Sequence, residues 1–126
     1  MTWTYQQSTG KLFDPDGDQR WTGYSGGNCG KNPDGVNNPA MENVACVGPL
    51  PVGNYTFGTP VEHSRLGPFA IPLHPAQDNV MFGRGGFFMH GDTTPSGNAS
   101  EGCVIMPRMI RIACWAHDDH NIDVIA

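Results

Sequence analysis

The chain has 126 residues and a formal net charge of −5, with only 7 Lys and Arg residues. This length suits one domain with its own core, which we place over residues 1–126, and leaves little room for a second. Without a basic patch, nucleic acids and anionic membranes are not expected as partners. The 17 glycines and 11 prolines are interleaved with aromatic residues, which favours short strands joined by many turns over disorder.

The first seven residues, Met-Thr-Trp-Thr-Tyr-Gln-Gln, contain no basic start, apolar core or cleavage site, so we expect no secretory signal peptide. No apolar run is long enough to cross a bilayer. Alternation over residues 3–7, a turn-like segment at 8–11 and the apolar residues 12–13 predict a β-hairpin. Residues 14–18, Asp-Pro-Asp-Gly-Asp, are predicted to form a turn, because the distal glutamate of a calcium loop is absent.

A third strand is predicted over residues 21–25, followed by a long loop over residues 26–47 with Cys29 and Cys46 near its ends. Long ordered loops need to be held in place. A disulfide between the two cysteines would contribute about 3 kcal/mol, whereas reduced thiols are expected while a protein remains in a cytoplasm, and the sequence leaves both open. A zinc site is less expected here, because no Cys-x-x-Cys or matching histidine pair occurs.

Further strands are predicted over residues 52–57, where Val52, Tyr55 and Phe57 suggest a half-buried pattern, and over residues 69–75. His74 could line a site, although an ordinary hydrogen-bonded histidine also fits. Arg84 has a planar guanidinium that suits a carboxylate. An ordinary surface arginine is the alternative.

The stretch from Phe87 to Met106 places His90 at the end of one apolar run and Cys103 before another. The loop between them is rich in turn-forming residues that can bring its ends together. An imidazole beside a thiol can take its proton and return it to a leaving amine. Gly102 leaves room for a carbonyl substrate, and nearby backbone N–H groups can hold an oxyanion. On residue types alone, an inert buried cysteine and a structural histidine fit as well.

A short helix is predicted over residues 107–116, because Pro107 suits a first turn and the apolar residues that follow, Met109, Ile112, Ala113 and Ala116, keep helical spacing. Cys114 on this helix is predicted to be buried and inert. The segment from His117 to His120 would put two histidines on one helical face. It lies where the helix should end and has no third ligand, so a solvated turn is predicted rather than a metal site. A strand over residues 122–125 follows.

His90-Gly91-Asp92, followed by Ala99-Ser100-Glu101-Gly102-Cys103, resembles the signature of the L,D-transpeptidase (YkuD-like) cysteine enzymes, which is a histidine, a spacer and Ser/Thr-x-Gly-Cys. Nearly the whole chain resembles the small type VI secretion effectors of that superfamily, bacterial toxins that act on peptidoglycan. The matching segments are Trp3–Tyr5, Ser8–Leu12, Gly23–Gly26, Asn37–Pro39, Gly48–Tyr55, Met81–Arg84 and Gly86–Asp92.

The resemblance implies a mainly β fold, a small single-domain mixed sheet or barrel-like sandwich with one short helix after Cys103. It implies an L,D-carboxypeptidase and L,D-transpeptidase that cleaves tetrapeptide stems between meso-diaminopimelate and the terminal D-alanine, without metal or cofactor. Cys103 would attack the diaminopimelate carbonyl, and His90 would activate the thiol and protonate the leaving amine. The thioester would then pass to water or to a D-amino acid.

The resemblance also implies roles for the residues around this pair. The amides of Gly102 and Cys103 would form an oxyanion hole, and Ser100 would shape the turn or hydrogen-bond near the thiolate. The expected substrate-binding residues are Arg84, Asp92, Glu101 and His74. Asp92 would either orient His90 or cap the loop.

Two positions depart from the wider superfamily. Glu101 stands where many members have histidine, and Ile105 stands where many have arginine, so recognition of the substrate carboxylate is expected to differ. The balance between hydrolysis and transfer is therefore left open.

The resemblance implies synthesis in the cytoplasm and delivery by a type VI apparatus into the periplasm of a target cell. The expected partners are peptidoglycan stem peptides, a secretion carrier and a cognate periplasmic immunity protein. Two alternatives stay open: a cysteine amidase or endopeptidase of another bond, and a non-catalytic wall-binding or phage structural module. Papain-like and NlpC-like amidases usually place cysteine before histidine, unlike this chain.

Overall fold

The computed structural model describes residues 2–93 and 96–126; Thr94 and Pro95, in the predicted loop between His90 and Cys103, lie outside the described residues. The described residues form ten strands and one α-helix, α1 (Arg108–Ala116). The strands are β1 (Trp3–Gln6), β2 (Lys11–Phe13), β3 (Gln19–Thr22), β4 (Tyr24–Ser25), β5 (Gly53–Phe57), β6 (Val61–His63), β7 (Gly67–Pro75), β8 (Phe88–His90), β9 (Val104–Ile105) and β10 (Asn121–Ile125).

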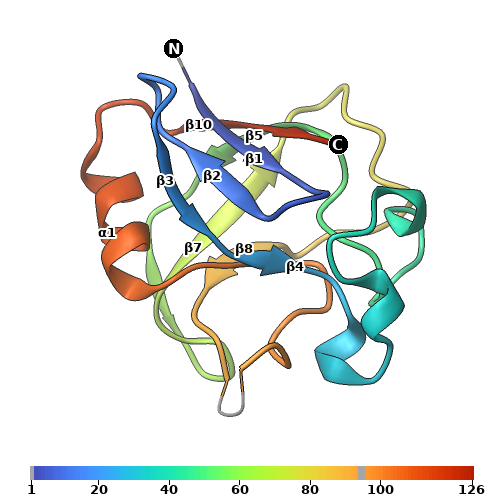
Figure 1. The fold of residues 1–126 in the computed structure, drawn as a ribbon. Helices are drawn as coiled ribbons and strands as arrows, with labels where there is room; N and C mark the ends of the chain where they lie inside the picture. The colour runs from blue at the N-terminus through green and yellow to red at the C-terminus, as the bar shows by residue number, and fades with distance from the viewer. Residues whose placement is uncertain (1, 94–95) are drawn as a thin grey trace.

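The strands form one mixed sheet in the order β3-β2-β1-β10-β5-β7-β8-β9-β4, with β6 paired to β7 (Figure 1). The β1–β10 and β8–β9 pairs are parallel, and their neighbours are antiparallel. The two ends of this order, β3 and β4, are separated along the chain by Gly23 alone, so the sheet curls into a nearly closed barrel. The predicted fold, a small mainly β barrel-like domain with one short helix after Cys103, is confirmed.

The prediction of one strand over residues 21–25 was wrong, because the structure divides this segment at Gly23 into β3 and β4. A Cβ atom at Gly23 would lie 1.9 Å from the Ile105 carbonyl oxygen. Only glycine allows the chain to pass so close to β9 as it crosses from one end of the strand order to the other.

The N-terminal hairpin and the turn after it are confirmed. β1 and β2 pair antiparallel, with Tyr5 opposite Leu12. The Asp14 carboxylate then accepts hydrogen bonds from the amides of Asp16 and Asp18, at 3.0 and 3.1 Å. A side-chain oxygen that accepts from its own downstream backbone is a turn device and needs no bound ion.

The core lies inside the barrel, where alternate residues of each strand point inward. Trp3, Tyr5, Tyr55 and Ile122 are each at most 1% exposed. In β5, Tyr55 and Phe57 are buried as predicted, but Val52 precedes the strand and is 42% exposed. Val52 therefore does not belong to the buried pattern.

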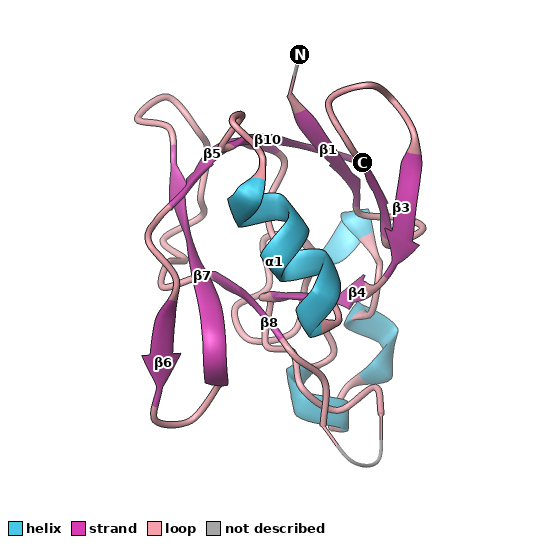
Figure 2. Ribbon diagram, turned by 90° about the vertical axis from the view of Figure 1, so that its left-hand side faces the viewer, coloured by secondary structure: helices cyan, strands magenta, loops and turns pink. Residues whose placement is uncertain are grey.

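The helix forms where it was predicted, but its buried face differs. Met109 and Ile112 are exposed, whereas Arg111 and Cys114 are buried. Arg111 turns inward because its guanidinium donates to the carbonyls of Pro68 and Phe69, at 3.0 and 2.9 Å, which fastens α1 to the start of β7. Figure 2 shows α1 across the front, with β7 to its left and β3 to its right. Within residues 2–93 and 96–126, no helix has the length and apolar character that a membrane span requires.

The histidines that follow α1 take part in packing. His120 stacks on Trp115 with ring centroids 4.1 Å apart, and its Nε2 lies 2.8 Å from the Trp115 carbonyl oxygen. The His117 ring meets Trp3 edge-on at 5.7 Å. Among the residues that the structure describes, no three His, Cys, Asp or Glu side chains gather as metal ligands would.

The predicted long loop between β4 and β5 is confirmed and contains three short 3-10 turns, η1 (Asn28–Gly30), η2 (Pro33–Gly35) and η3 (Pro39–Met41). Cys29 and Cys46 are both free thiols. Hydrogen bonds hold the loop in place: Gly27 N donates to Val47 O at 2.7 Å, and Cys29 N donates to Ser100 O at 2.9 Å. The second bond brings the loop against the segment that carries Cys103.

The stability of the barrel can be tested on β10, the central strand that joins β1 to β5. Ile122 is fully buried, whereas Ile125 on the same strand is 45% exposed. We expect Ile122→Ala to lower the free energy of unfolding by about 2–5 kcal/mol, because it opens a cavity in the core. Ile125→Ala should cost less than about 1 kcal/mol. Urea titrations monitored by tryptophan fluorescence would measure both, and equal costs would contradict the register described here.

Candidate functional site

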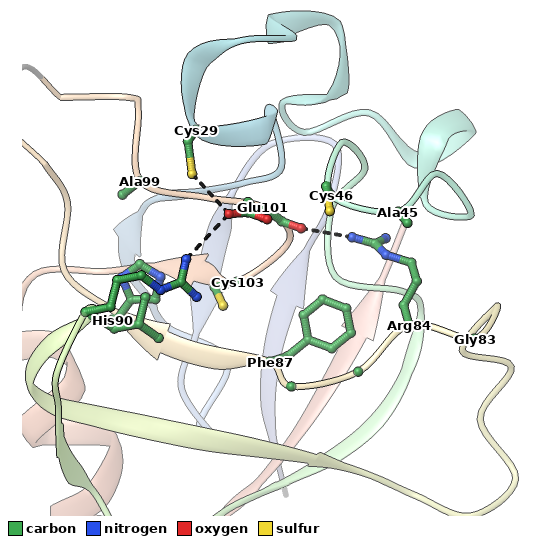
Figure 3. Close-up of a pocket in the computed structure, with 14 residues that line it drawn as sticks. Cys29, Ala45, Cys46, Gly83, Arg84, Phe87, His90, Ala99, Glu101 and Cys103 are labelled. Carbon is green, nitrogen blue, oxygen red and sulfur yellow. Dashed lines mark hydrogen bonds and ion pairs between the residues drawn. The ribbon is translucent and has the colours of Figure 1, made fainter.

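A cavity of about 270 Å³ opens at one side of the barrel, between the long loop, the β6–β7 turn and the segment before β8 (Figure 3). Three thiols line it, those of Cys29, Cys46 and Cys103. Its lining consists of Cys29, Ala45, Cys46, Arg65, Leu66, Gly83, Arg84, Gly85, Gly86, Phe87, His90, Ala99, Glu101 and Cys103.

His90 and Cys103 come together at this cavity, as the sequence predicted. His90 ends β8 and Cys103 immediately precedes β9, and these two strands are parallel neighbours with Met89 opposite Val104. One residue earlier in this register, Cys103 lies beside Phe88. The side chains of Phe88 and His90 point to the same face of β8, because they are two residues apart. The Phe88 amide donates to the Cys103 sulfur at 3.3 Å, in agreement with that register. Both side chains therefore line one pocket (Figure 3).

His90 has one ring nitrogen in use and one available. Nδ1 lies 2.9 Å from the Gly91 carbonyl oxygen, and a carbonyl can only accept, so Nδ1 carries the proton. Nε2 is then the unprotonated nitrogen, and it is buried without a hydrogen-bond partner among the described residues. Burial lowers the pKa of His90, and the nearby positive charges of Arg111 and Arg65 lower it further. The ring is therefore neutral at neutral pH and has a free lone pair, as a general base requires.

The Cys103 thiol is also neutral in this state. Burial raises its pKa from 9.0 to about 11, against the hydrogen bond from Phe88 and the charge of Arg65, which both lower it. Burial thus disfavours the charged form of both partners. The arrangement fits a thiol that loses its proton to His90 during attack, rather than a thiolate and imidazolium pair formed beforehand.

Ser100 organises the turn before Cys103. Its hydroxyl oxygen accepts from the amides of Gly26 and Gly102, at 2.8 and 3.0 Å, and donates to the Cys103 carbonyl at 2.6 Å. The side chain is 1% exposed and does not line the pocket. Of the two roles expected for Ser100, the structure gives it the shaping of the turn.

Gly102 has a different role from the one expected. Its amide is engaged by Ser100, so in this state it is not free to hold an oxyanion. Its φ of +128° favours glycine, and a Cβ there would meet the Arg84 guanidinium at 2.5 Å and the Phe87 ring at 2.7 Å. Gly102 therefore makes room for the side chains of Arg84 and Phe87.

Arg84 lines the pocket, but its guanidinium is occupied. Its terminal nitrogens donate to the carbonyl oxygens of Glu42, Pro49, Gly48 and Glu101, at 2.5–3.2 Å. All four terminal N–H bonds are thereby used, and the guanidinium carbon lies 5.2 Å from the centre of the Phe87 ring. Neither a carboxylate-binding role nor a simple surface position describes Arg84, because it fastens the long loop to the turn before Cys103.

Asp92 and His74, two of the expected substrate-binding residues, are not among the residues that line this pocket. Asp92 accepts from the Tyr24 hydroxyl at 2.5 Å and from the amides of Thr93 and Gly97. It therefore caps the loop, and the Gly91 carbonyl orients His90 instead. His74 is exposed on β7 because it follows buried Leu73, and successive side chains of a strand point to opposite faces.

Glu101 does reach the pocket, together with three residues to which sequence reasoning gave no role in the site. Its carboxylate accepts from the Cys29 thiol at 3.6 Å and pairs with Arg65 at 3.6 Å. Cys46 lies on the same rim (Figure 3). The scarcity of basic residues was the one signal for Arg65, since any cation near the site had to come from the 7 Lys and Arg of the chain.

A comparison with protein-family models matches residues 19–124 to the Tlde1 domain. The match covers most of the chain, including every residue that lines the pocket. Comparisons with curated proteins and with solved structures return no match.

The protonation state of the thiol can be tested by alkylation. With a pKa near 11, Cys103 should be about 100-fold less ionised at neutral pH than a thiol of ordinary pKa, since two pKa units correspond to this ratio. We expect its rate of modification by iodoacetamide, followed by peptide mass spectrometry, to rise steadily with pH up to about pH 10. A rate that stays flat down to pH 6 would show a preformed thiolate instead. Cys114, which is fully buried, should stay unmodified.

The role of Ser100 can be tested by removal of its hydroxyl. Ser100→Ala leaves the buried amides of Gly26 and Gly102 without an acceptor, so we expect a loss of about 2–4 kcal/mol in the free energy of unfolding. Ser96→Ala, at an exposed position of the same loop, is the matched control and should be neutral within about 0.5 kcal/mol. Equal stability of the two variants would show that the hydroxyl does not support the turn.

Proposed function

The chain belongs to the Tlde1 domain family of type VI secretion effectors directed at peptidoglycan, and on this premise we propose that it is an L,D-carboxypeptidase and L,D-transpeptidase with Cys103 as nucleophile. The proposed substrate is the tetrapeptide stem, cleaved between meso-diaminopimelate and the terminal D-alanine. The observation that carries the proposal is the unpartnered Nε2 of His90, buried in the same pocket as the Cys103 sulfur.

In the proposed first step, His90 Nε2 takes the Cys103 proton as the sulfur attacks the diaminopimelate carbonyl carbon. The Phe88 amide, which donates to the sulfur at 3.3 Å, stabilises the charge that develops there. The tetrahedral intermediate collapses when the C–N bond breaks, and His90 returns the proton to the amine of D-alanine. A thioester between Cys103 and the shortened stem remains.

In the second step, water or the amine of a D-amino acid attacks the thioester carbonyl while His90 takes a proton from it. The C–S bond then breaks, and the Cys103 sulfur recovers the proton. Water yields a tripeptide stem, and a D-amino acid yields an exchanged tetrapeptide. Since Gly102 N is bound to Ser100, an oxyanion donor has to come from another group at the rim or from a rearrangement of this turn.

Family membership fits secretion into a target cell. We propose the periplasm as the place of action, a type VI carrier as the partner in delivery, and an immunity protein as the partner in the producing cell.

The activity can be tested on purified sacculi by identifying muropeptides by mass. We expect the wild type to convert tetrapeptides to tripeptides, and Cys103→Ala and His90→Gln to lose at least about 1,000-fold in rate, since each removes a member of the reacting pair. His74→Gln is the matched histidine control and should keep full activity, because His74 does not line the pocket. Unchanged muropeptides after treatment with folded wild-type protein would refute the proposed function.

A further inference from the structure

Two opposite charges stand at the rim of the cavity, Arg65 on the β6–β7 turn and Glu101 two residues before Cys103. Their nearest nitrogen and oxygen atoms are 3.6 Å apart, and the side chains are 72% and 42% exposed. Ion pairs as exposed as this one contribute little to stability. The pair can therefore open for a ligand without a large loss of folding free energy.

Arg65 is the pocket cation that is free to meet a ligand. The terminal N–H groups of Arg84 are occupied by backbone carbonyls. In the described part of the chain, the ion pair with Glu101 is the interaction that engages the Arg65 guanidinium. A planar guanidinium with unused N–H groups suits a carboxylate, which it can bind through two parallel hydrogen bonds.

The backbone that carries Arg65 is fixed relative to the thiol. His63 Nδ1 accepts from the amides of Arg65 and Leu66, both at 3.1 Å. The His63 ring packs edge-on against Phe88 at 5.2 Å, and the Phe88 amide donates to the Cys103 sulfur. The turn with Arg65 is thus anchored to the strand that holds the sulfur.

Glu101 is held from the opposite side of the cavity. Its backbone carbonyl accepts from Arg84 at 3.2 Å, so the position of its main chain is set. Its Oε1 atom faces both Cys29 and Arg65. Figure 3 shows the Glu101 side chain at the opening, between Cys29 and Cys103. A carboxylate in this place can accept hydrogen bonds from an ammonium group.

We propose that Arg65 and Glu101 bind the zwitterionic end of an amino acid, with its carboxylate on Arg65 and its ammonium group on Glu101. Such a ligand replaces one ion pair by two, so neither side chain is left with an unpaired charge. The inference rests on the proposed function, which offers two sources of this chemistry. One is the distal ammonium and carboxylate of diaminopimelate in the stem, and the other is a free D-amino acid acceptor.

Binding to the Cys103→Ala protein tests this inference without turnover. The probes are two synthetic tetrapeptides with meso-diaminopimelate or L-lysine as third residue, since lysine keeps the ammonium group and lacks the carboxylate. We expect calorimetry to show about tenfold or greater preference for diaminopimelate, the size of one charge-assisted hydrogen bond. Adding Arg65→Gln should abolish the preference for diaminopimelate. Adding Glu101→Gln should weaken the binding of both peptides, because both carry the ammonium group.

A second arm covers the acceptor. Free D-methionine and its amide, which lacks the carboxylate, are titrated into the same proteins. A preference for D-methionine that is lost with Arg65→Gln would support the inference and assign the pair to the acceptor. Equal affinities within both ligand pairs, or preferences that survive Arg65→Gln, would overturn it.

Two controls separate recognition from structure. Arg20→Gln removes another ion pair, Arg20 with Asp14 at 3.5 Å, away from the pocket, and should leave affinities within about twofold of the parent. The double variant Arg65→Glu with Glu101→Arg keeps an ion pair but reverses its direction. Full recovery of the preference in this variant would mean that the pair is only structural and would also overturn the inference. Failure of the wild type on sacculi would count against the proposed function alone.

Discussion

The site depends on one buried hydroxyl. Ser100 Oγ bonds at once to the amides of Gly26 and Gly102 and to the carbonyl of Cys103. Ser25 is also buried and bonds to the backbone in a similar way: its hydroxyl donates to the Gly102 carbonyl and accepts from the Leu50 amide. These two small side chains thus supply hydrogen-bond partners to buried backbone N–H and C=O groups of a tight turn. Without partners, burial of these groups would cost free energy. The long loop, the Cys103 turn and the end of β4 are joined through them.

The same burial that makes these hydrogen bonds strong also sets the chemistry of the pocket. It keeps both His90 and Cys103 neutral, raising the pKa of the thiol and lowering that of the imidazole. A neutral pair stores no ionic nucleophile that could react with adventitious electrophiles. In the proposed mechanism, proton transfer waits for a carbonyl carbon to arrive, and the Phe88 amide, which donates to the Cys103 sulfur, stabilises the charge that develops there.

Local patterns in the sequence predict the elements well and their partners poorly. The hairpin, the Asp14 turn and the helix each follow from short-range spacing and turn chemistry, and the meeting of His90 with Cys103 follows from the turn-rich loop between them and from the family resemblance. The role of Arg84 could not be foreseen, because its four acceptors come from separate segments of the chain. The burial of Arg111 could not be foreseen for the same reason. Its guanidinium donates to the carbonyls of Pro68 and Phe69, which lie in a distant segment of the chain, so a charged side chain points inward. Arg65 reaches the cavity only because the β6–β7 turn folds over it.

The parallel pairing of β1 with β10 sets Trp3 against Ile122, near opposite ends of the chain. Contacts between residues so far apart in sequence are slow to form, because a long stretch of chain must first be closed into a loop. The β1–β2 hairpin needs no such closure, since its strands are neighbours in the sequence. We therefore expect β10 to join β1 late in folding, so that the barrel around His90 and Cys103 is complete only after this long-range pair has formed.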